Sequence, residues 1–307
     1  MHSHAHGHHD HSHGHPQEIQ NISFSFVIAV AANLGFTVLE AFYAFIADSA
    51  SLLADAGHNL SDVLGLLLAW GAAYLATQRT SKLYSYGFRR TTIMAALINA
   101  VVLILASVFI AIESVDKLLN PSPISEIAVM VVAGIGIVVN AGSALLFRQG
   151  SKKDLNLKGA YLHLAYDALI SVGVVVSAAI IYFTGWIWLD GVAGLMIVVV
   201  IVLGTWGLLR DSINLMLDAV PQHIDREEVL SYLCGIEGVT AVHDLHIWAL
   251  STNESCLTAH LVMPENTLWD SDSGYGEVGQ VLQTRFDIHH VTLQVEKDTE
   301  CATQDCD

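Results

Sequence analysis

Six long apolar segments constrain what this chain can fold into. They cover about residues 22–47, 50–77, 91–118, 125–147, 159–184 and 187–209. Each is longer than the roughly 20 residues that a helix needs to cross a bilayer. Only 14% of the residues are charged, whereas soluble domains contain about 25%. We therefore expect an α-helical membrane protein with six transmembrane helices.

Basic residues are unevenly distributed among the loops between these segments. The loops after the second and fourth segments hold eight of them: Arg79, Lys82, Arg89, Arg90, Arg148, Lys152, Lys153 and Lys158. The other three loops contain only Lys117, at the edge of the third loop. Because Lys and Arg are enriched in cytoplasmic loops, the second and fourth loops are expected in the cytosol. With six helices, the N- and C-termini are then cytoplasmic too.

The last third of the chain is strongly acidic, which indicates a separate soluble domain. Residues 211–307 contain 18 acidic and 3 basic residues, so they account for most of the formal net charge of −17. Nucleic-acid binding is excluded, because it requires a basic face. We expect a His-rich tail at 1–20, a six-helix transmembrane domain at 21–210, and a cytoplasmic α/β domain at 211–307.

Periodicity within this acidic domain predicts the order helix, strand, strand, helix, strand. Asp225 is expected to cap the first helix, with Glu228 three residues later. The later elements are expected at 242–250, 256–263, 268–286 and 291–296. The helix at 268–286 is expected to be interrupted at Ser273 and Gly274. A ferredoxin-like fold satisfies this order of elements.

The N-terminus is a histidine-rich tract without the features of a secretory signal peptide. Eight histidines lie between residues 2 and 15, interleaved with Ser, Ala, Gly and Asp. Such a tract cannot form a core and is expected to be disordered. Because His-rich tracts bind metals loosely, a metal-collecting role and a dispensable tail both stay open.

All four cysteines lie in the last third of the chain: Cys234, Cys256, Cys301 and Cys306. Their number and placement do not indicate a disulfide framework. In a cytosolic domain they are expected to be reduced thiols.

Two copies of one short pattern carry the chemistry of the membrane half. His58 and Asp62 are four residues apart in the second apolar segment, and His163 and Asp167 repeat this spacing in the fifth. Residues at i and i+4 share one face of a helix. Ionisable residues inside a membrane are costly and therefore indicate function. Two histidines and two aspartates supply the four ligands of a tetrahedral zinc site.

The alternative for each pair alone is that His and Asp satisfy each other within a helix bundle. The repetition of the pattern in two separate segments favours a metal. Neutral His nitrogen and carboxylate oxygen suit Zn²⁺, whereas harder Mn²⁺ and Fe²⁺ sites favour more carboxylate. Since metal binding requires deprotonated ligands, and His titrates near neutral pH, zinc binding is expected to displace protons.

Other polar residues in the apolar segments are expected to serve the helix bundle. Glu40, Asn33, Asn99 and Asn140 are predicted to make interhelical hydrogen bonds. Asp55 lies one turn before His58 and is expected either to support the metal ligands or to line the outer exit.

Three strings of sequence resemble one family of transporters. They run from Ser51 to Asp62 (SLLADAGHNLSD), from Lys158 to His163 (KGAYLH) and from His243 to Leu250 (HDLHIWAL). Together with the six helices and the α/β tail, they resemble the cation diffusion facilitator family, on its zinc-transporting branch similar to the bacterial zinc, cobalt and cadmium efflux proteins. The resemblance covers nearly the whole chain after the His-rich tail.

This resemblance implies a homodimeric exporter of Zn²⁺ that exchanges the metal for protons by alternating access. It implies His58, Asp62, His163 and Asp167 as the transport site, and a bacterial inner membrane as the location. It also implies a charge interlock between membrane and tail, for which Arg90 and Asp218 lie at about the matching places. The loop at 79–90 has no usual zinc ligand, so a further family site there is expected to be absent.

The resemblance further implies a regulatory zinc site in the cytoplasmic domain. His243, His260 and Glu296 match family ligand positions there. Cys301 and Cys306 are candidates for additional thiolate ligands, although their spacing departs from the CxxC ending of animal zinc transporters.

The sequence also bears on competing functions. A membrane zinc hydrolase is disfavoured because the sequence contains no HExxH motif, so an enzyme is not expected. Efflux of other divalent metals (Cd, Co, Mn, Fe) and a membrane zinc sensor without transport stay open.

One geometric question is left open by the segment boundaries. Asp62 and Asp167 are predicted to lie at depths that differ by roughly 10 Å at 1.5 Å per helical residue. The pairs meet if the second helix protrudes into the cytosol, or if the fifth helix begins earlier than residue 159.

Overall fold

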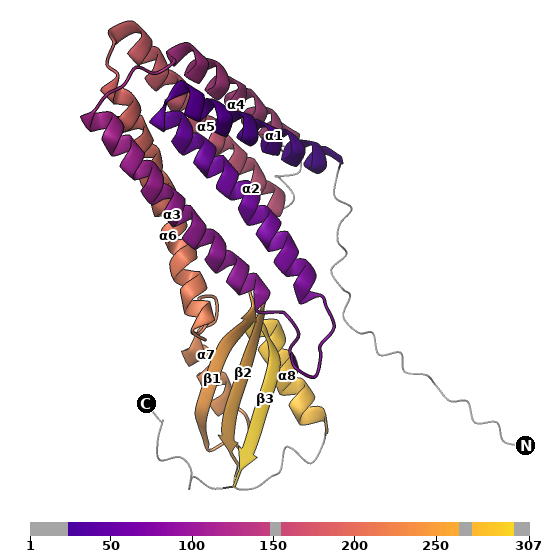
Figure 1. Ribbon diagram of the computed structural model, residues 1–307. Coiled ribbons are helices and arrows are strands. Elements are labelled where there is room, and N and C mark those ends of the chain that lie inside the picture. The colour runs from indigo at the N-terminus through magenta and orange to yellow at the C-terminus, as the bar shows by residue number, and fades with distance from the viewer. Residues whose placement is uncertain (1–23, 148–154, 264–271, 298–307) are drawn as a thin grey trace, which may run out of the picture.

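The computed structural model of the protein describes residues 24–147, 155–263 and 272–297 (Figure 1). The His-rich tail and the two last cysteines lie outside these residues. The membrane part consists of six helices: α1 (Phe24–Ala47), α2 (Ala50–Ala76), α3 (Thr91–Leu119), α4 (Glu126–Phe147), α5 (Leu155–Thr184) and α6 (Trp188–Met216). Helices α2 to α6 are long and apolar enough to cross a membrane, and α1 is an apolar helix of 24 residues.

Four of the six helices form two pairs, and these pairs pack around α1 and α2. Helix α3 runs along α6, and α4 runs along α5, whereas α2 contacts α1, α3, α5 and α6 (Figure 1). Large apolar side chains such as Phe45, Trp70 and Leu105 point outward, as expected for a surface in lipid. The helical membrane domain predicted from the sequence is confirmed, and the central place of α2 lets its polar face meet α5.

The start of α2 is capped by a carboxylate from α6. Asp190 is buried, and its carboxylate accepts hydrogen bonds from the hydroxyls of Ser49 at 2.7 Å and Ser51 at 2.5 Å. It also accepts from the backbone amide of Ala50 at 2.5 Å. These contacts satisfy donors that a helix N-terminus leaves without intrahelical partners. They fix the depth of α2 relative to α6.

Five further elements form the cytoplasmic domain: α7 (Arg226–Cys234), β1 (Ala241–Ser251), β2 (Glu254–Val262), α8 (Asp272–Phe286) and β3 (Ile288–Glu296). The sheet order is β1-β2-β3, with β1 and β2 antiparallel and β2 and β3 parallel. Both helices contribute to the apolar core against the sheet. The predicted α-β-β-α-β order and a small mixed sheet of ferredoxin-like type are confirmed.

The details of this domain both support and correct the sequence predictions. Asp225 caps α7, since its carboxylate accepts from the amides of Glu227 at 2.8 Å and Glu228 at 3.3 Å. The predicted interruption at Ser273 and Gly274 is wrong, because both residues lie within the first turn of α8. Strand β3 begins three residues earlier than predicted, because fully buried Ile288 fills the core at its start.

The two domains are joined by polar contacts at the start of α3. Arg90 forms an ion pair with Asp218, as the expected interlock requires. Next to it, Arg89 forms an ion pair with Glu254, at the start of β2. The amide of Thr252 donates to the hydroxyl of Thr92 at 3.1 Å. The turn between β1 and β2 is therefore fastened to the membrane domain.

Candidate metal centre

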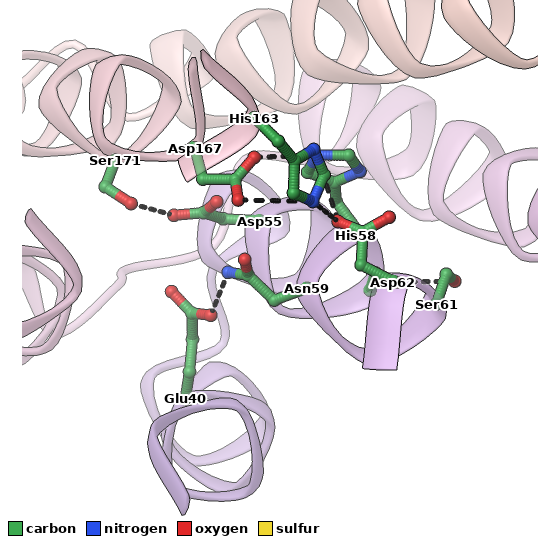
Figure 2. Close-up of polar contacts among 10 residues, drawn as sticks. Glu40, Asp55, His58, Asn59, Ser61, Asp62, His163, Asp167 and Ser171 are labelled. Carbon is green, nitrogen blue, oxygen red and sulfur yellow. Dashed lines mark hydrogen bonds and ion pairs between the residues drawn. The ribbon is translucent and has the colours of Figure 1, made fainter. Parts of the chain in front are cut away.

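The structure brings the two predicted His–Asp pairs together between α2 and α5 (Figure 2). His58 Nε2 lies 3.5 Å from Asp62 Oδ2 and 3.3 Å from Asp167 Oδ1. His163 Nε2 lies 3.3 Å from Asp62 Oδ2 and 3.6 Å from Asp167 Oδ2. Each imidazole therefore faces an oxygen of both carboxylates.

These separations suit a small tetrahedral ion. With metal–ligand distances of about 2.0–2.2 Å, the ligand atoms of a tetrahedron lie about 3.3–3.6 Å apart. The four His–Asp separations fall in this range, and the donor atoms of His58, Asp62 and Asp167 all lie within 4.8 Å of one another. The donor set, two nitrogens and two carboxylates, matches the preferences of zinc.

Mutual satisfaction of the four side chains does not account for their arrangement. Of the four contacts, only the one between His58 and Asp167 has hydrogen-bond geometry. Asp62 Oδ2 is buried and has no hydrogen-bond partner among the described residues, although it faces both histidine nitrogens. A buried carboxylate oxygen without a partner is costly, and a cation between the four groups would compensate it.

Exposure differs across the cluster. The side chain of Asp167 is only 3% exposed, whereas that of His163 is 48% exposed. His58 and Asp62 lie between these values. The site is thus closed on the Asp167 side and most open at His163.

Local sequence explains how α2 presents its ligands. Gly57 precedes His58, and a Cβ at this position would lie 2.7 Å from Cδ1 of Ile110. The glycine lets α3 approach α2 closely beside the site. Helix α5 begins at Leu155, four residues before the sequence estimate of 159, so Asp167 lies deeper in the helix than predicted. Asp167 lies 12 residues after the start of α5 (167 minus 155), and Asp62 lies 14 residues before the end of α2 (76 minus 62). At about 1.5 Å per residue the two depths differ by only about 3 Å, which answers the question of depth raised by the sequence.

Neighbouring polar residues form a second layer that the sequence indicated only in part. Asn59 donates to Glu40 across α1 and α2 at 2.8 Å, which confirms the interhelical bond predicted for Glu40 (Figure 2). Asp55 accepts from Ser171 at 2.8 Å. Ser171 lies four residues after Asp167, so the helical spacing that identified the ligands also extends to it. The bond predicted for Asn140 is wrong, since its buried amide has no hydrogen-bond partner in the part of the chain that the structure describes.

A second cluster of ligand atoms lies on the cytoplasmic sheet. His243 on β1 is paired with His260 on β2, and Glu296 ends β3. Glu296 approaches His243 Nε2 and His260 Nδ1 at 3.0 Å each, and the donor atoms of all three residues lie within 4.8 Å of one another. The three residues expected from the family resemblance are thus adjacent in space.

Other described histidines and cysteines of this domain lie outside the cluster. His290 lies 3.3 Å from Arg89, and His289 lies 3.7 Å from Asp287. Cys234 and Cys256 are free thiols, and burial, followed by the charge of Glu254, raises the pKa of the Cys256 thiol. A raised pKa disfavours the thiolate form that binds metals.

The fold and the two pairs define a multi-pass membrane protein with a cluster of two histidines and two aspartates between its helices. The family model of the cation efflux transmembrane domain matches residues 26–217, and that of the cation efflux protein cytoplasmic domain matches residues 221–298. The chain belongs to the cation efflux, or cation diffusion facilitator, family. Members of this family are transporters rather than enzymes, and the cytoplasmic domain is a dimerisation domain.

Several characterised relatives are similar along most of their length. The cadmium, cobalt and zinc/H(+)-K(+) antiporter of Bacillus subtilis is 34% identical over 85% of both chains. The metal cation efflux system protein CzcD of Cupriavidus metallidurans is 36% identical over 89% of this chain and 86% of its own. The zinc transporter ZitB of Escherichia coli is 32% identical over 91% of this chain and 88% of its own.

Proposed function

We propose that the protein exports Zn²⁺ from the cytosol in exchange for protons, with the ion held by His58, Asp62, His163 and Asp167. The observation that carries this proposal is that each of the two histidine nitrogens lies 3.3–3.6 Å from an oxygen of both carboxylates, between α2 and α5. The names of the relatives, which include zinc transporters and proton-coupled antiporters, support the direction and the counter-ion.

The chemistry of the ligands couples zinc binding to proton release. An imidazole binds metal only through an unprotonated nitrogen, so His58 and His163 must release any proton on Nε2 before zinc binds. After zinc leaves on the other side of the membrane, the carboxylates that face each nitrogen favour return of the proton. Metal and protons therefore occupy the site in turn, which is the requirement for exchange.

Each part of the chain has a place in this proposal. Residues 21–210 form the transport unit of a homodimer in a bacterial inner membrane, with both termini in the cytosol. Residues 211–307 form the cytoplasmic unit, in which His243, His260 and Glu296 bind a regulatory zinc ion. Residues 1–20 form a His-rich tail that collects metal.

Efflux of other divalent metals, among them cadmium, cobalt, manganese and iron, is the nearest alternative. Cadmium and cobalt are named for the Bacillus subtilis relative. The presence of a histidine on each helix favours zinc over manganese and iron. A membrane zinc sensor without transport is the other alternative.

The purified protein in proteoliposomes tests the proposal. Zinc added outside should enter vesicles that contain a zinc dye, and a dye for internal pH should report alkalinisation as protons leave. Equal loading of Cd²⁺, Co²⁺ or Mn²⁺ in the same assay ranks the metals. Bound zinc without flux would make the protein a sensor, and zinc flux without a pH change would make it a uniporter.

A further inference from the structure

Two carboxyl groups next to the metal centre are not among its ligands. Glu40 on α1 and Asp55 on α2 are both fully buried. Within the described part of the chain, neither forms an ion pair with a Lys, Arg or His. Buried acidic groups without a cation are costly in any protein and more so in a membrane.

Each of these carboxyls has one satisfied and one unsatisfied oxygen. Glu40 Oε2 accepts from Asn59 Nδ2, and Asp55 Oδ2 accepts from Ser171 Oγ, both at 2.8 Å (Figure 2). The remaining oxygens, Glu40 Oε1 and Asp55 Oδ1, are buried without a donor from another described residue. Protonation makes such a carboxyl neutral and so removes the cost of burying its charge.

The charges that face this pair are those of the metal centre. Glu40 interacts electrostatically with Asp55 and Asp167, and Asp55 interacts with His58 and Asp167. On α4, the buried polar residue Asn140 is neutral, so it adds no charge. The pair is also tied to the ligand helices, since Asn59 follows His58 directly.

Electrostatics predicts different protonation of this pair in the metal-free and the metal-bound state. Without metal, two neighbouring buried carboxyls cannot both be ionised, so one of them holds a proton. A divalent cation at the four ligands adds positive charge beside the pair and favours the ionised form. Arrival of the metal therefore promotes loss of this proton, and departure of the metal promotes its return.

We propose that Glu40, paired with Asp55, carries an exchangeable proton of the transport cycle in addition to those on the histidine ligands. The inference rests on the proposed zinc–proton exchange. When zinc binds, the O–H bond of the neutral carboxyl breaks, the electron pair stays on the carboxylate, and the proton passes to water on the side from which zinc entered. The reverse step takes a proton from the other side after zinc has left.

Glu40→Gln tests this proposal in proteoliposomes. Glutamine preserves the size of the side chain and its hydrogen bond with Asn59, but it cannot exchange a proton. The variant should still transport zinc, and the number of protons moved per zinc ion should fall by about one. Glu113→Gln, a partly exposed glutamate of α3 outside the network, is the matched control and should keep the wild-type ratio.

The results separate this proposal from the function on which it rests. A wild-type protein that moves zinc without any protons contradicts the exchange itself. A wild-type ratio of protons to zinc in Glu40→Gln means that the carboxyl is only structural, and the inference fails.

A measurement on the wild-type protein covers the case in which Glu40→Gln does not fold. Zinc-induced infrared difference spectra should show loss of the carbonyl-stretch band of a protonated carboxylic acid. Absence of such a loss contradicts the inference, and in a folded Glu40→Gln protein the band should be missing.

Discussion

His58 and Asp167 are 109 positions apart in the chain, yet His58 Nε2 lies 3.3 Å from Asp167 Oδ1 between α2 and α5. Their contact joins α2 to α5 at a place where ionisable side chains from both helices gather. Because Asp167 is almost fully buried, its charge acts at close range and with little screening by water. Movement of α5 relative to α2 would therefore change the metal affinity directly.

The close packing of α3 and α6 predicts a strong effect of a small substitution. A Cβ at Gly191 would lie 2.6 Å from the carbonyl oxygen of Ser114 and 3.0 Å from the amide of Leu118. Gly191→Ala should therefore force α3 and α6 apart and cost about 1–3 kcal/mol, as overpacking does. Thermal unfolding in detergent measures the loss.

Gly204→Ala is the matched control on the same helix. A Cβ at Gly204 would meet no atom within 4 Å, and alanine is a better helix former by about 1 kcal/mol. The control should be as stable as the wild type or more so. Equal melting temperatures for the two variants would contradict the packing described for α3 and α6.

The donor set of the membrane site predicts a change in selectivity. His163→Asp replaces a nitrogen ligand by a harder oxygen, which favours harder metals. In competition assays with vesicles, uptake of Mn²⁺ relative to Zn²⁺ should rise several-fold. Tyr161→Phe, two residues before His163 on the same helix, is the control and should keep the wild-type ratio. An unchanged ratio in His163→Asp would place the selectivity elsewhere in the protein.

The cytoplasmic cluster predicts zinc binding that is independent of the membrane site. In an Asp167→Ala background, equilibrium dialysis should still detect zinc bound to the full-length protein. Adding His243→Ala and His260→Ala should lower the bound zinc by about one ion per chain, because both imidazoles face Glu296 at 3.0 Å. His289→Ala, on the same sheet but outside the cluster, should have no such effect. Unchanged binding after loss of both histidines would exclude a metal site at this cluster.

Local patterns predicted most elements of the fold, whereas contacts between elements depended on tertiary packing. Four-residue spacing placed His58 with Asp62 and His163 with Asp167 on single helix faces. That these faces meet depends on the start of α5 at Leu155, inside a polar stretch that hydropathy alone left out. Local alternation likewise predicted β3, but its first residues are set by burial of Ile288 against the helices.

Polar residues inside the apolar segments were harder to assign. Glu40 makes the predicted interhelical bond and Asn140 does not, although both are buried polar residues of the same kind of segment. Asp190 caps α2 from another helix, a contact between residues 140 positions apart that no local pattern reports. Such bonds depend on which side chains face each other after packing.

The most direct test of the central claim is zinc flux through Asp167→Asn in proteoliposomes. The substitution keeps the shape of the side chain but removes the charge that faces both histidines, so a tetrahedral site loses one anionic ligand. Ser177→Ala, at a buried residue of the same helix whose hydroxyl has no hydrogen-bond partner within residues 24–147, 155–263 and 272–297, is the control and should transport zinc at close to the wild-type rate. We predict that Asp167→Asn, folded and inserted, loses zinc flux at least about 100-fold, as expected when a charged ligand is lost. Flux near the wild-type level in Asp167→Asn would contradict the assignment of the transport site.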